Sequence, residues 1–320
     1  MSHKSRGTCA AFLVLMSSLG ALSSAELNFT LLNNFSSDRK IFLQYGVISG
    51  LILVIGTFYS VFCLKAGNEY YSRGVAQRRS MKELIAVAKK SMKTPEITNG
   101  FTAAFLARGD SILLSLYLVL WTYGFYDPAD RTNETYEQAF SRSSMLSGFA
   151  YLTIMFTCII YGFYYERKNY SRSKIMIAML SIAAVGALLI NFAVSSSSFM
   201  AYLSMIVLGI GMSGLLTASL YLVNEYSTPE SRGFITGLQT FFGVVGILFQ
   251  TIIGAVLYEW NTCGPFDYFA VTCIVVLVIT IVIYRRGKQE LSNTPLVDQS
   301  NSILTEREGD TPERSGEVAV

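Results

Sequence analysis

Long apolar blocks without proline are the feature that most constrains this chain. Seven blocks of roughly 20 residues are clear, and an eighth, weaker block lies near the N-terminus. The clear blocks span 41–64, 103–126, 145–164, 175–194, 200–223, 234–257 and 267–284, and the weaker one spans 8–25. A membrane-spanning helix needs about 20 mostly apolar residues, and all 6 prolines fall between the blocks or in the tail. The sequence therefore predicts an all-α polytopic membrane protein with about eight transmembrane helices.

Composition excludes several other classes of protein. Only 15% of the residues are charged while 52% are hydrophobic, and the net charge of +3 is too small to indicate a nucleic-acid partner. The 1 histidine, His3, and the 5 cysteines have no metal-ligand spacing. No set of acid, base and nucleophile is apparent either. We therefore expect no metal, no cofactor and no enzymatic activity.

The distribution of Lys and Arg orients the predicted spans. With eight spans and both termini in the cytosol, most basic loop residues fall on the cytosolic side, in 65–100 and 165–174. The sequons at Asn28, Asn34 and Asn133 then fall outside, where glycosylation is expected. This predicts a multi-pass glycoprotein of the plasma membrane or an endomembrane, with the lipid bilayer as its first partner.

An internal similarity suggests repeated halves. Ser5-Arg6-Gly7 precedes the first apolar block, and the same tripeptide, Ser231-Arg232-Gly233, precedes a late block 226 residues further on. Parallel repeats of this kind are typical of transporters. Between the copies, the basic segment 66–100 reads as a partly helical linker. Its amphipathic run 81–90 fits either the inner membrane surface or a solvated connector equally well.

Two loops carry a resemblance to a known family. One is Gly162-Phe-Tyr-Tyr-Glu166-Arg167-Lys168, followed by further basic residues, and the other is Pro229-Glu-Ser-Arg232-Gly233. In this order and spacing, the chain resembles the major facilitator superfamily of secondary transporters. The match in the first loop is partial, because Glu166 stands where the family has Asp. The resemblance implies that Gly162, Glu166, Arg167, Arg232 and Gly233 belong to gating loops.

The resemblance also implies a domain order. Residues 1–65 would be the last two helices of an N-terminal half, 66–100 a cytosolic linker, 101–288 a complete six-helix C-terminal half, and 289–320 a disordered tail. The implied function is transport of a small solute by alternating access, with or without a coupling ion. Four family helices precede the part that this chain resembles. A truncated gene model, a split half that needs a partner subunit and a decayed paralogue all stay open.

Charged residues within a predicted span mark the candidate solute path. Arg108 and Asp110 lie in the block 103–126, and charge inside a membrane is costly and usually functional. At about 100° per residue, Arg108 shares a helix face with Ser111 and Ser115, whereas Asp110 lies on the opposite face. We expect Arg108, Ser111 and Ser115 to face the path. Anchoring of Arg108 at the membrane interface is the equal alternative.

A stripe of small and polar residues marks the block 234–257. It consists of Gln239, Gly243, Gly246 and Gln250, which recur on one helix face. Small residues let helices approach closely, so the stripe fits either an ordinary packing seam or the interface between two transporter halves.

A seven-helix receptor is the rival interpretation. Residues 1–25 also resemble a cleavable signal peptide, and cleavage would leave seven spans with a glycosylatable N-terminal tail outside. The sequence lacks an Asp/Glu-Arg-Tyr motif after the third of those spans and an Asn-Pro-x-x-Tyr motif in the last. The transporter is therefore the favoured interpretation.

Overall fold

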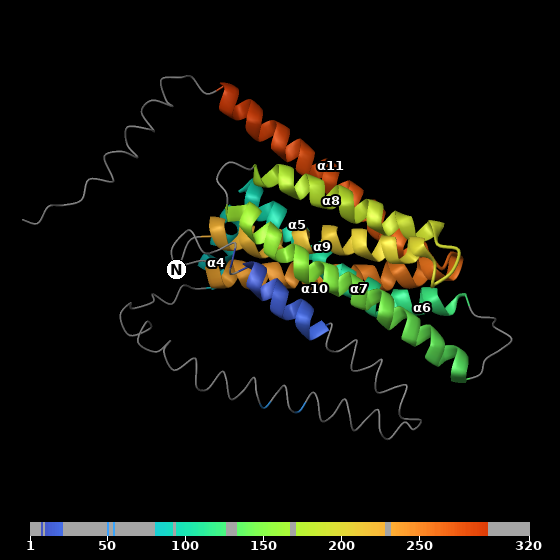
Figure 1. The fold of residues 1–320 in the computed structure, drawn as a ribbon. Coiled ribbons are helices and arrows are strands. Elements are labelled where there is room, and N and C mark those ends of the chain that lie inside the picture. The colour runs from blue at the N-terminus through green and yellow to red at the C-terminus, as the bar shows by residue number, and fades with distance from the viewer. Residues whose placement is uncertain are drawn as a thin grey trace, which may run out of the picture.

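All regular structure that the computed structural model describes is helical (Figure 1). The described residues are 8, 10–21, 50, 54, 81–91, 94–125, 133–166, 171–227 and 232–293. The helices are α4 (Met81–Ser91), α5 (Pro95–Ile112), η3 (Leu113–Tyr117), α6 (Leu118–Tyr123), α7 (Asn133–Glu166), α8 (Arg172–Leu189), η4 (Ile190–Phe192), α9 (Phe199–Tyr226), α10 (Arg232–Trp260) and α11 (Gly264–Asn293). A shorter apolar helix, Ala10–Ala21, precedes them.

Six of the described helical segments are long and apolar enough to cross a membrane. They are Pro95–Tyr123, Gln138–Tyr165, Arg172–Phe192, Phe199–Tyr226, Arg232–Trp260 and Gly264–Arg285. Each corresponds to one of the last six apolar blocks, which confirms the all-α polytopic fold. The weak block 8–25 contains the helix Ala10–Ala21, and nearly all of the block 41–64 lies outside the described residues.

The first spanning segment begins earlier than the apolar pattern predicts. Pro95 opens α5, inside the range 66–100 that we expected to be linker, and Thr94 before it is extended. Proline suits the first turn of a helix because its missing N–H has no helical partner there. At the other end, α11 continues to Asn293, so the segment 289–293, which we expected to begin the tail, is helical. The amphipathic run after residue 80 forms the separate helix α4.

Helix α9 forms the centre of the bundle. It is the most buried of the spanning segments and packs against α5, α7 and α8. Small residues make this possible: a Cβ added at Gly209 would lie 2.7 Å from the carbonyl oxygen of Ala150 in α7. One helical turn further along, the hydroxyls of Ser213 and Thr157 share a hydrogen bond of 2.6 Å.

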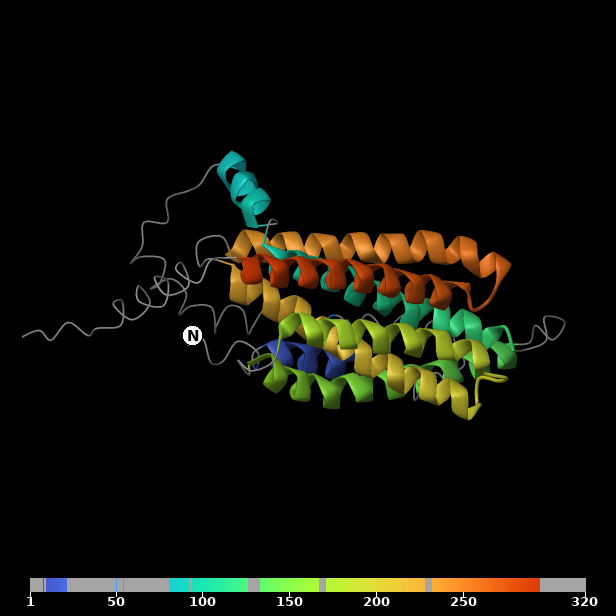
Figure 2. The same cartoon turned by 90° about the horizontal axis from the view of Figure 1, so that it is seen from above.

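The remaining helices surround this centre. Helix α10 packs on α5 and α11, and α11 also packs on α8. Figure 2 shows α5, α10 and α11 together on one side of the bundle, with α7, α8 and the Ala10–Ala21 helix on the other. Near one end, the Asn191 amide donates a hydrogen bond of 2.7 Å to the Asp267 carboxylate and so links η4 to α11.

Helices α5, η3 and α6 form one spanning segment with a π-helical turn in its middle. The turn ends at Tyr117, whose hydroxyl donates a hydrogen bond of 2.6 Å to the Thr251 carbonyl in α10. Glycine allows this contact, because a Cβ added at Gly254 would lie 2.7 Å from the Tyr117 ring. The segment is therefore joined to α10 along its length, and this pair of helices positions the candidate site.

Candidate functional site

The two charged side chains of the first spanning segment lie on opposite sides of α5. Arg108 is exposed, whereas Asp110 is buried at 4% exposure. The helical period predicts this division. The Asp110 carboxylate lies within electrostatic reach of Tyr151 in α7 and Cys273 in α11, inside the bundle. Of this pair, only Arg108 is available to a molecule that enters from outside the described helices.

Arg108 lies across α10 at a glycine. A Cβ added at Gly243 would be 2.7 Å from the Cγ atom of Arg108 and 3.4 Å from its Cβ atom. The aliphatic part of Arg108 therefore passes directly over the bare backbone of α10. Because any other residue at 243 would push this part of the side chain aside, Gly243 determines where the stem of Arg108 lies.

A cavity of about 80 Å³ lies beside Arg108, between α5, α9 and α10. We call it the Arg108 pocket. Its polar lining consists of Arg108, Ser219, Thr236, Gln239 and Thr240, and its apolar lining of Ala104, Ala107, Leu216 and Leu220. None of the nine described residues that line it is acidic. The pocket combines one permanent positive charge with hydroxyl and amide groups from two further helices.

The other two predicted path residues continue the exposed face of α5 beyond the pocket. The Ser111 hydroxyl donates a hydrogen bond of 2.7 Å to the Arg108 carbonyl, and Ser115 is exposed within the π-helical turn. Neither lines the Arg108 pocket. The pocket thus brings the Arg108 side chain together with Ser219, Thr236 and Thr240, which sequence reasoning missed. Ser111 and Ser115 lie outside the pocket lining.

The glycine and glutamine stripe of α10 is buried. Gln239 lines the Arg108 pocket, Gly243 and Gly246 lie against α5, and the Gln250 amide donates a hydrogen bond of 3.0 Å to the Pro265 carbonyl of α11. Of the two interpretations that the sequence leaves open, the contacts among the described residues are those of a packing seam, because glycines at 243 and 246 allow α5 to approach that face of α10. A role of the stripe at an interface between two halves stays a prediction.

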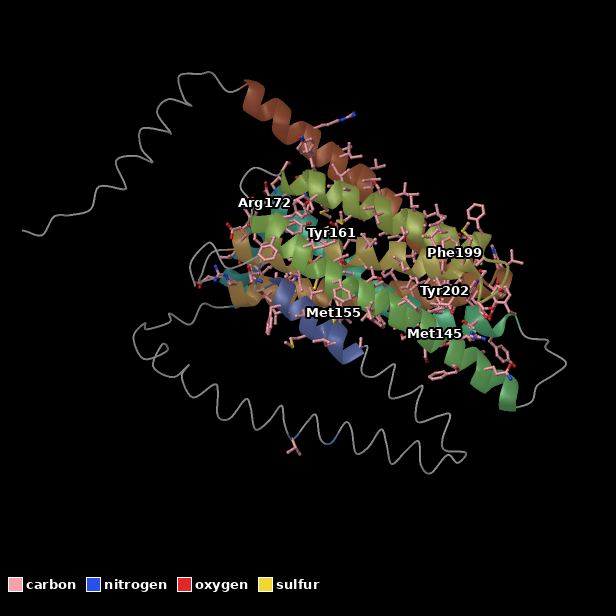
Figure 3. The ribbon with its side chains drawn as sticks, viewed as in Figure 1. Met145, Met155, Tyr161, Arg172, Phe199 and Tyr202 are labelled. Atoms are coloured by element: carbon pink, nitrogen blue, oxygen red, sulfur yellow. The ribbon has the colours of Figure 1, made fainter. Side chains whose placement is uncertain are left out.

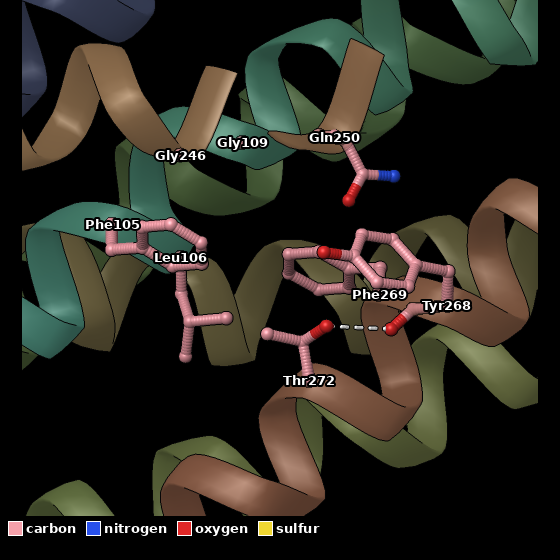
Figure 4. A pocket seen from close by; sticks show the side chains of 8 residues that line it. All are labelled: Phe105, Leu106, Gly109, Gly246, Gln250, Tyr268, Phe269 and Thr272. Atoms are coloured by element: carbon pink, nitrogen blue, oxygen red, sulfur yellow. Dashed lines mark hydrogen bonds between the residues drawn. The ribbon is translucent and has the colours of Figure 1, made fainter. Parts of the chain in front are cut away.

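A second, smaller cavity adjoins the stripe. It measures about 10 Å³, which is about the space of one water molecule. Figure 4 shows its lining from α5, α10 and α11: Phe105, Leu106, Gly109, Gly246, Gln250, Tyr268, Phe269 and Thr272. The Thr272 hydroxyl is already used, since it donates a hydrogen bond of 2.8 Å to the Tyr268 carbonyl. This cavity is too small and too apolar to hold a solute.

Arg172 lies near one end of the bundle, which we call the Arg172 end (Figure 3). The predicted gating-loop residues that the structure describes lie near the end of α7 and at the start of α10. Gly162 is buried in α7, Glu166 is the last residue of α7, and Arg167 lies outside the described residues. Arg232 opens α10, and its buried Nε atom has no hydrogen-bond partner among the described residues. Gly233 is exposed, with no atom near an added Cβ.

Arg172 makes the best-defined contacts at this end. Its guanidinium donates hydrogen bonds to the hydroxyl of Tyr226 and, at 3.0 Å, to that of Tyr221. It also lies 5.3 Å from the centre of each of these two rings. The start of α8 is therefore attached to the end of α9. Arg172 follows the partial loop motif in the sequence, which is the signal that could have singled it out.

Of the three glycosylation candidates, the structure describes only Asn133. Asn133 is the first residue of α7, and Asn28 and Asn34 lie outside the described residues. Their modification stays a prediction.

The described residues form six spanning segments, one of which is the central α9, with a charged pocket between α5, α9 and α10, and these features define an integral multi-pass membrane protein. The family model of the Major Facilitator Superfamily matches residues 100–308, which cover all six spans except the first few residues of Pro95–Tyr123. The chain belongs to this superfamily, as the loop motifs indicated. The superfamily is one of transporters rather than enzymes, and no observation favours the seven-helix receptor.

Two curated relatives are similar over part of their length. Magnetosome protein MamH of Paramagnetospirillum magneticum is 23% identical over 196 residues, which cover 61% of this chain and 44% of the relative. Magnetosome protein MamZ of Magnetospirillum gryphiswaldense is 26% identical over 171 residues, which cover 53% of this chain and 25% of the relative. The chain thus spans less than half the length of the curated relatives it matches.

Proposed function

We propose that this chain forms the C-terminal part of a secondary transporter that moves a small solute across a membrane by alternating access. The observation that carries the proposal is the exposed Arg108 in the middle of a spanning segment, beside a pocket with polar groups from three helices. A guanidinium exposed at this depth is costly in lipid but not in a water-filled path. Membership of the superfamily supports secondary transport as the activity.

The pocket lies in the half of the bundle nearer the Arg172 end. Ser219 and Gln239 are each about two helical turns from the ends of α9 and α10 at Tyr226 and Arg232. The distribution of Lys and Arg predicts that this end is cytosolic. A solute in the Arg108 pocket would then be bound on the cytosolic side of the midplane, and rocking of two halves would open the path to either side in turn.

The coupling of transport to an ion gradient stays open in this proposal. Asp110 is the one acidic residue in the middle of the described spans, and it lies on the face of α5 away from the pocket. A proton carried on Asp110 would have to act through the helix rather than by contact with the solute. Facilitated diffusion and symport are both compatible with this placement.

Uptake of a mixed solute pool tests the proposal. Cells that express the full-length protein are given an isotope-labelled metabolite extract, and the labelled solutes that they accumulate are identified by mass spectrometry. We expect at least one solute to accumulate only in expressing cells, and its uptake to fall at least tenfold in Arg108→Ala. Arg142→Ala, which removes an exposed arginine of α7 far from the pocket lining, should leave uptake unchanged.

Surface abundance must be equal among these variants for the comparison to hold. Unchanged uptake in Arg108→Ala at equal abundance would remove Arg108 from the path. No solute above background with the wild-type protein would count against transport itself.

A further inference from the structure

The charge balance around Arg108 points to the chemical class of the ligand. The guanidinium is protonated at any physiological pH. No ion pair joins it to another of the described residues, and none of the nine residues that line the pocket is acidic. Asp110, two residues away, is within electrostatic reach of Arg108, but its carboxylate is buried on the opposite face of α5. Among the described residues, the positive charge therefore has no counter-charge in the lining of the pocket itself.

The remaining polar groups of the pocket offer hydrogen-bond donors. Gln239, 5% exposed, contributes an amide N–H group, and Thr236 contributes a hydroxyl. The hydroxyls of Ser219 and Thr240 donate within their own helices, at 2.9 Å to the Leu216 carbonyl and 3.1 Å to the Thr236 carbonyl. Arg108, Gln239 and Thr236 are thus the groups left to bind a ligand, and together they match oxygen atoms that carry negative charge.

The size of the pocket limits what it holds. A volume of about 80 Å³ is several times the 10–15 Å³ that one water needs, yet it is too small for a drug-sized molecule. A single carboxylate, phosphate or sulfate group has the right scale. A larger solute would place only its anionic group in the pocket and extend along the exposed face of α5, toward Ser111 and Ser115.

We propose that the Arg108 pocket binds the oxyanion group of a small anionic solute, with Arg108 as the ion-pairing residue and Gln239 and Thr236 as donors. This deepens the proposed function and rests on it. Gly243 acts as a positioning residue, because its lack of a Cβ lets the stem of Arg108 lie across α10. Gly237, on the same helix, has no atom within 4 Å of an added Cβ and provides a matched control.

Thermal unfolding of the purified full-length protein in dodecyl maltoside tests the inference. Sodium phosphate, sodium sulfate and trisodium citrate are titrated at constant ionic strength against sodium chloride, choline chloride and glucose. We expect at least one of the three oxyanions to raise the Tm of the wild type where the controls do not. Its apparent Kd should rise at least tenfold in Arg108→Gln, since hydrogen bonds to a charged group are lost, and change less than twofold in Arg142→Gln.

Further variants separate binding from folding. Gly243→Ala should weaken oxyanion binding severalfold through displacement of Arg108, whereas Gly237→Ala should not. If Arg108→Gln fails to fold, Arg108→Lys decides: it keeps the charge but loses the planar fork, and binding should weaken while remaining measurable. Added phosphatidylglycerol distinguishes a free oxyanion from a lipid headgroup. If the pocket binds the headgroup, the lipid should saturate it and phosphate should then no longer raise the Tm. If the pocket binds a free oxyanion, phosphate should still raise the Tm.

Several results would overturn the inference. These are no Tm response to any of the three oxyanions, a response equal in Arg108→Gln, or stabilisation by choline instead. Failure here is distinguishable from failure of transport. A protein that binds an oxyanion through Arg108 but accumulates no solute keeps this inference and loses the proposed function. A protein that transports a neutral or cationic solute but binds no oxyanion through Arg108 keeps the proposed function and loses this inference.

Discussion

The exposed faces of α5 and α10 differ in chemistry although they belong to neighbouring helices. The exposed or half-exposed residues of α5 and η3, which we call the α5 face, include the polar Arg108, Ser111 and Ser115 beside the apolar Phe105, Ile112 and Leu116. The large exposed side chains along the middle of α10 are apolar, namely Phe241, Val244, Leu248, Phe249, Ile252 and Val256, while its exposed Thr240 lines the Arg108 pocket. A lipid-facing surface requires the second composition, and a water-filled path tolerates the first. Neighbouring helices of this bundle are therefore built for two different surroundings.

Helix α10 shows the same logic within one helix. Its buried face carries two glutamines and three glycines, and its exposed face carries the large apolar side chains. This is the reverse of a helix on the surface of a soluble protein. In lipid, apolar side chains gain little by burial, so close backbone approach and hydrogen bonds hold helices together. The predictions below test this division, from the largest expected effect to the smallest.

The largest effect is expected at the buried stripe. Gly246→Leu would drive a side chain into the backbone of Phe105 in α5, where no flexible group can give way. We expect a loss of about 3 kcal/mol or more, and little monodisperse protein by fluorescence-detected size-exclusion chromatography. The control is Gly237→Leu on the same helix, which should elute normally. A normal profile for Gly246→Leu would mean that α5 and α10 do not pack as described.

A charge placed on each exposed face tests directly whether that face lies in lipid or in a water-filled path. Val244→Arg puts a guanidinium in the middle of the apolar face of α10, at a cost of about 3 kcal/mol for membrane insertion. Ser115→Arg puts the same group on the exposed face of α5 and should cost much less. The measurement is the fraction of protein inserted into microsomes. Equal losses in both variants would break the comparison.

The accessibility of introduced cysteines to a thiol reagent also tests whether the α5 face is in water and the α10 face in lipid. A cysteine perturbs each face less than an arginine does. Ser115→Cys and Leu248→Cys place a cysteine on the exposed faces of α5 and α10 respectively. A charged, membrane-impermeant maleimide should label the first at least ten times faster, because thiolates form only where water is present. Labelling of the unaltered chain gives the background. Similar rates at both positions would show that the α5 face is not in water.

The apolar blocks predict the spanning helices well because they depend only on length and hydropathy. The same pattern misses the start of α5, since Pro95 can open a helix as well as separate two helices. Arg108 could be found from the sequence, because a charge in an apolar block is rare. Ser219, Thr236 and Thr240 could not, because isolated hydroxyl residues are common in spanning helices and only packing brings these three together.

The stripe on α10 shows a different limit of the sequence. The spacing of Gln239, Gly243, Gly246 and Gln250 predicts a close helix contact, but it does not say which helix makes it. The contact with α5 falls at Phe105 and Arg108, and the spacing of the stripe points to neither residue. The structure was needed to show that this stripe positions Arg108.

The smallest effect is expected at the seam that joins the two compared helices. Tyr117→Phe removes the hydroxyl that donates to the Thr251 carbonyl, and it leaves the ring over Gly254 in place. We expect a loss of about 1 kcal/mol, the usual net value of one such hydrogen bond, seen as a Tm lowered by a few degrees. Tyr202→Phe is the matched control, because that hydroxyl makes only an exposed contact of 3.5 Å with the Met145 sulfur (Figure 3). If the two variants unfold at the same temperature, the hydroxyl of Tyr117 does not hold α5 to α10, and packing against the glycines alone maintains the seam.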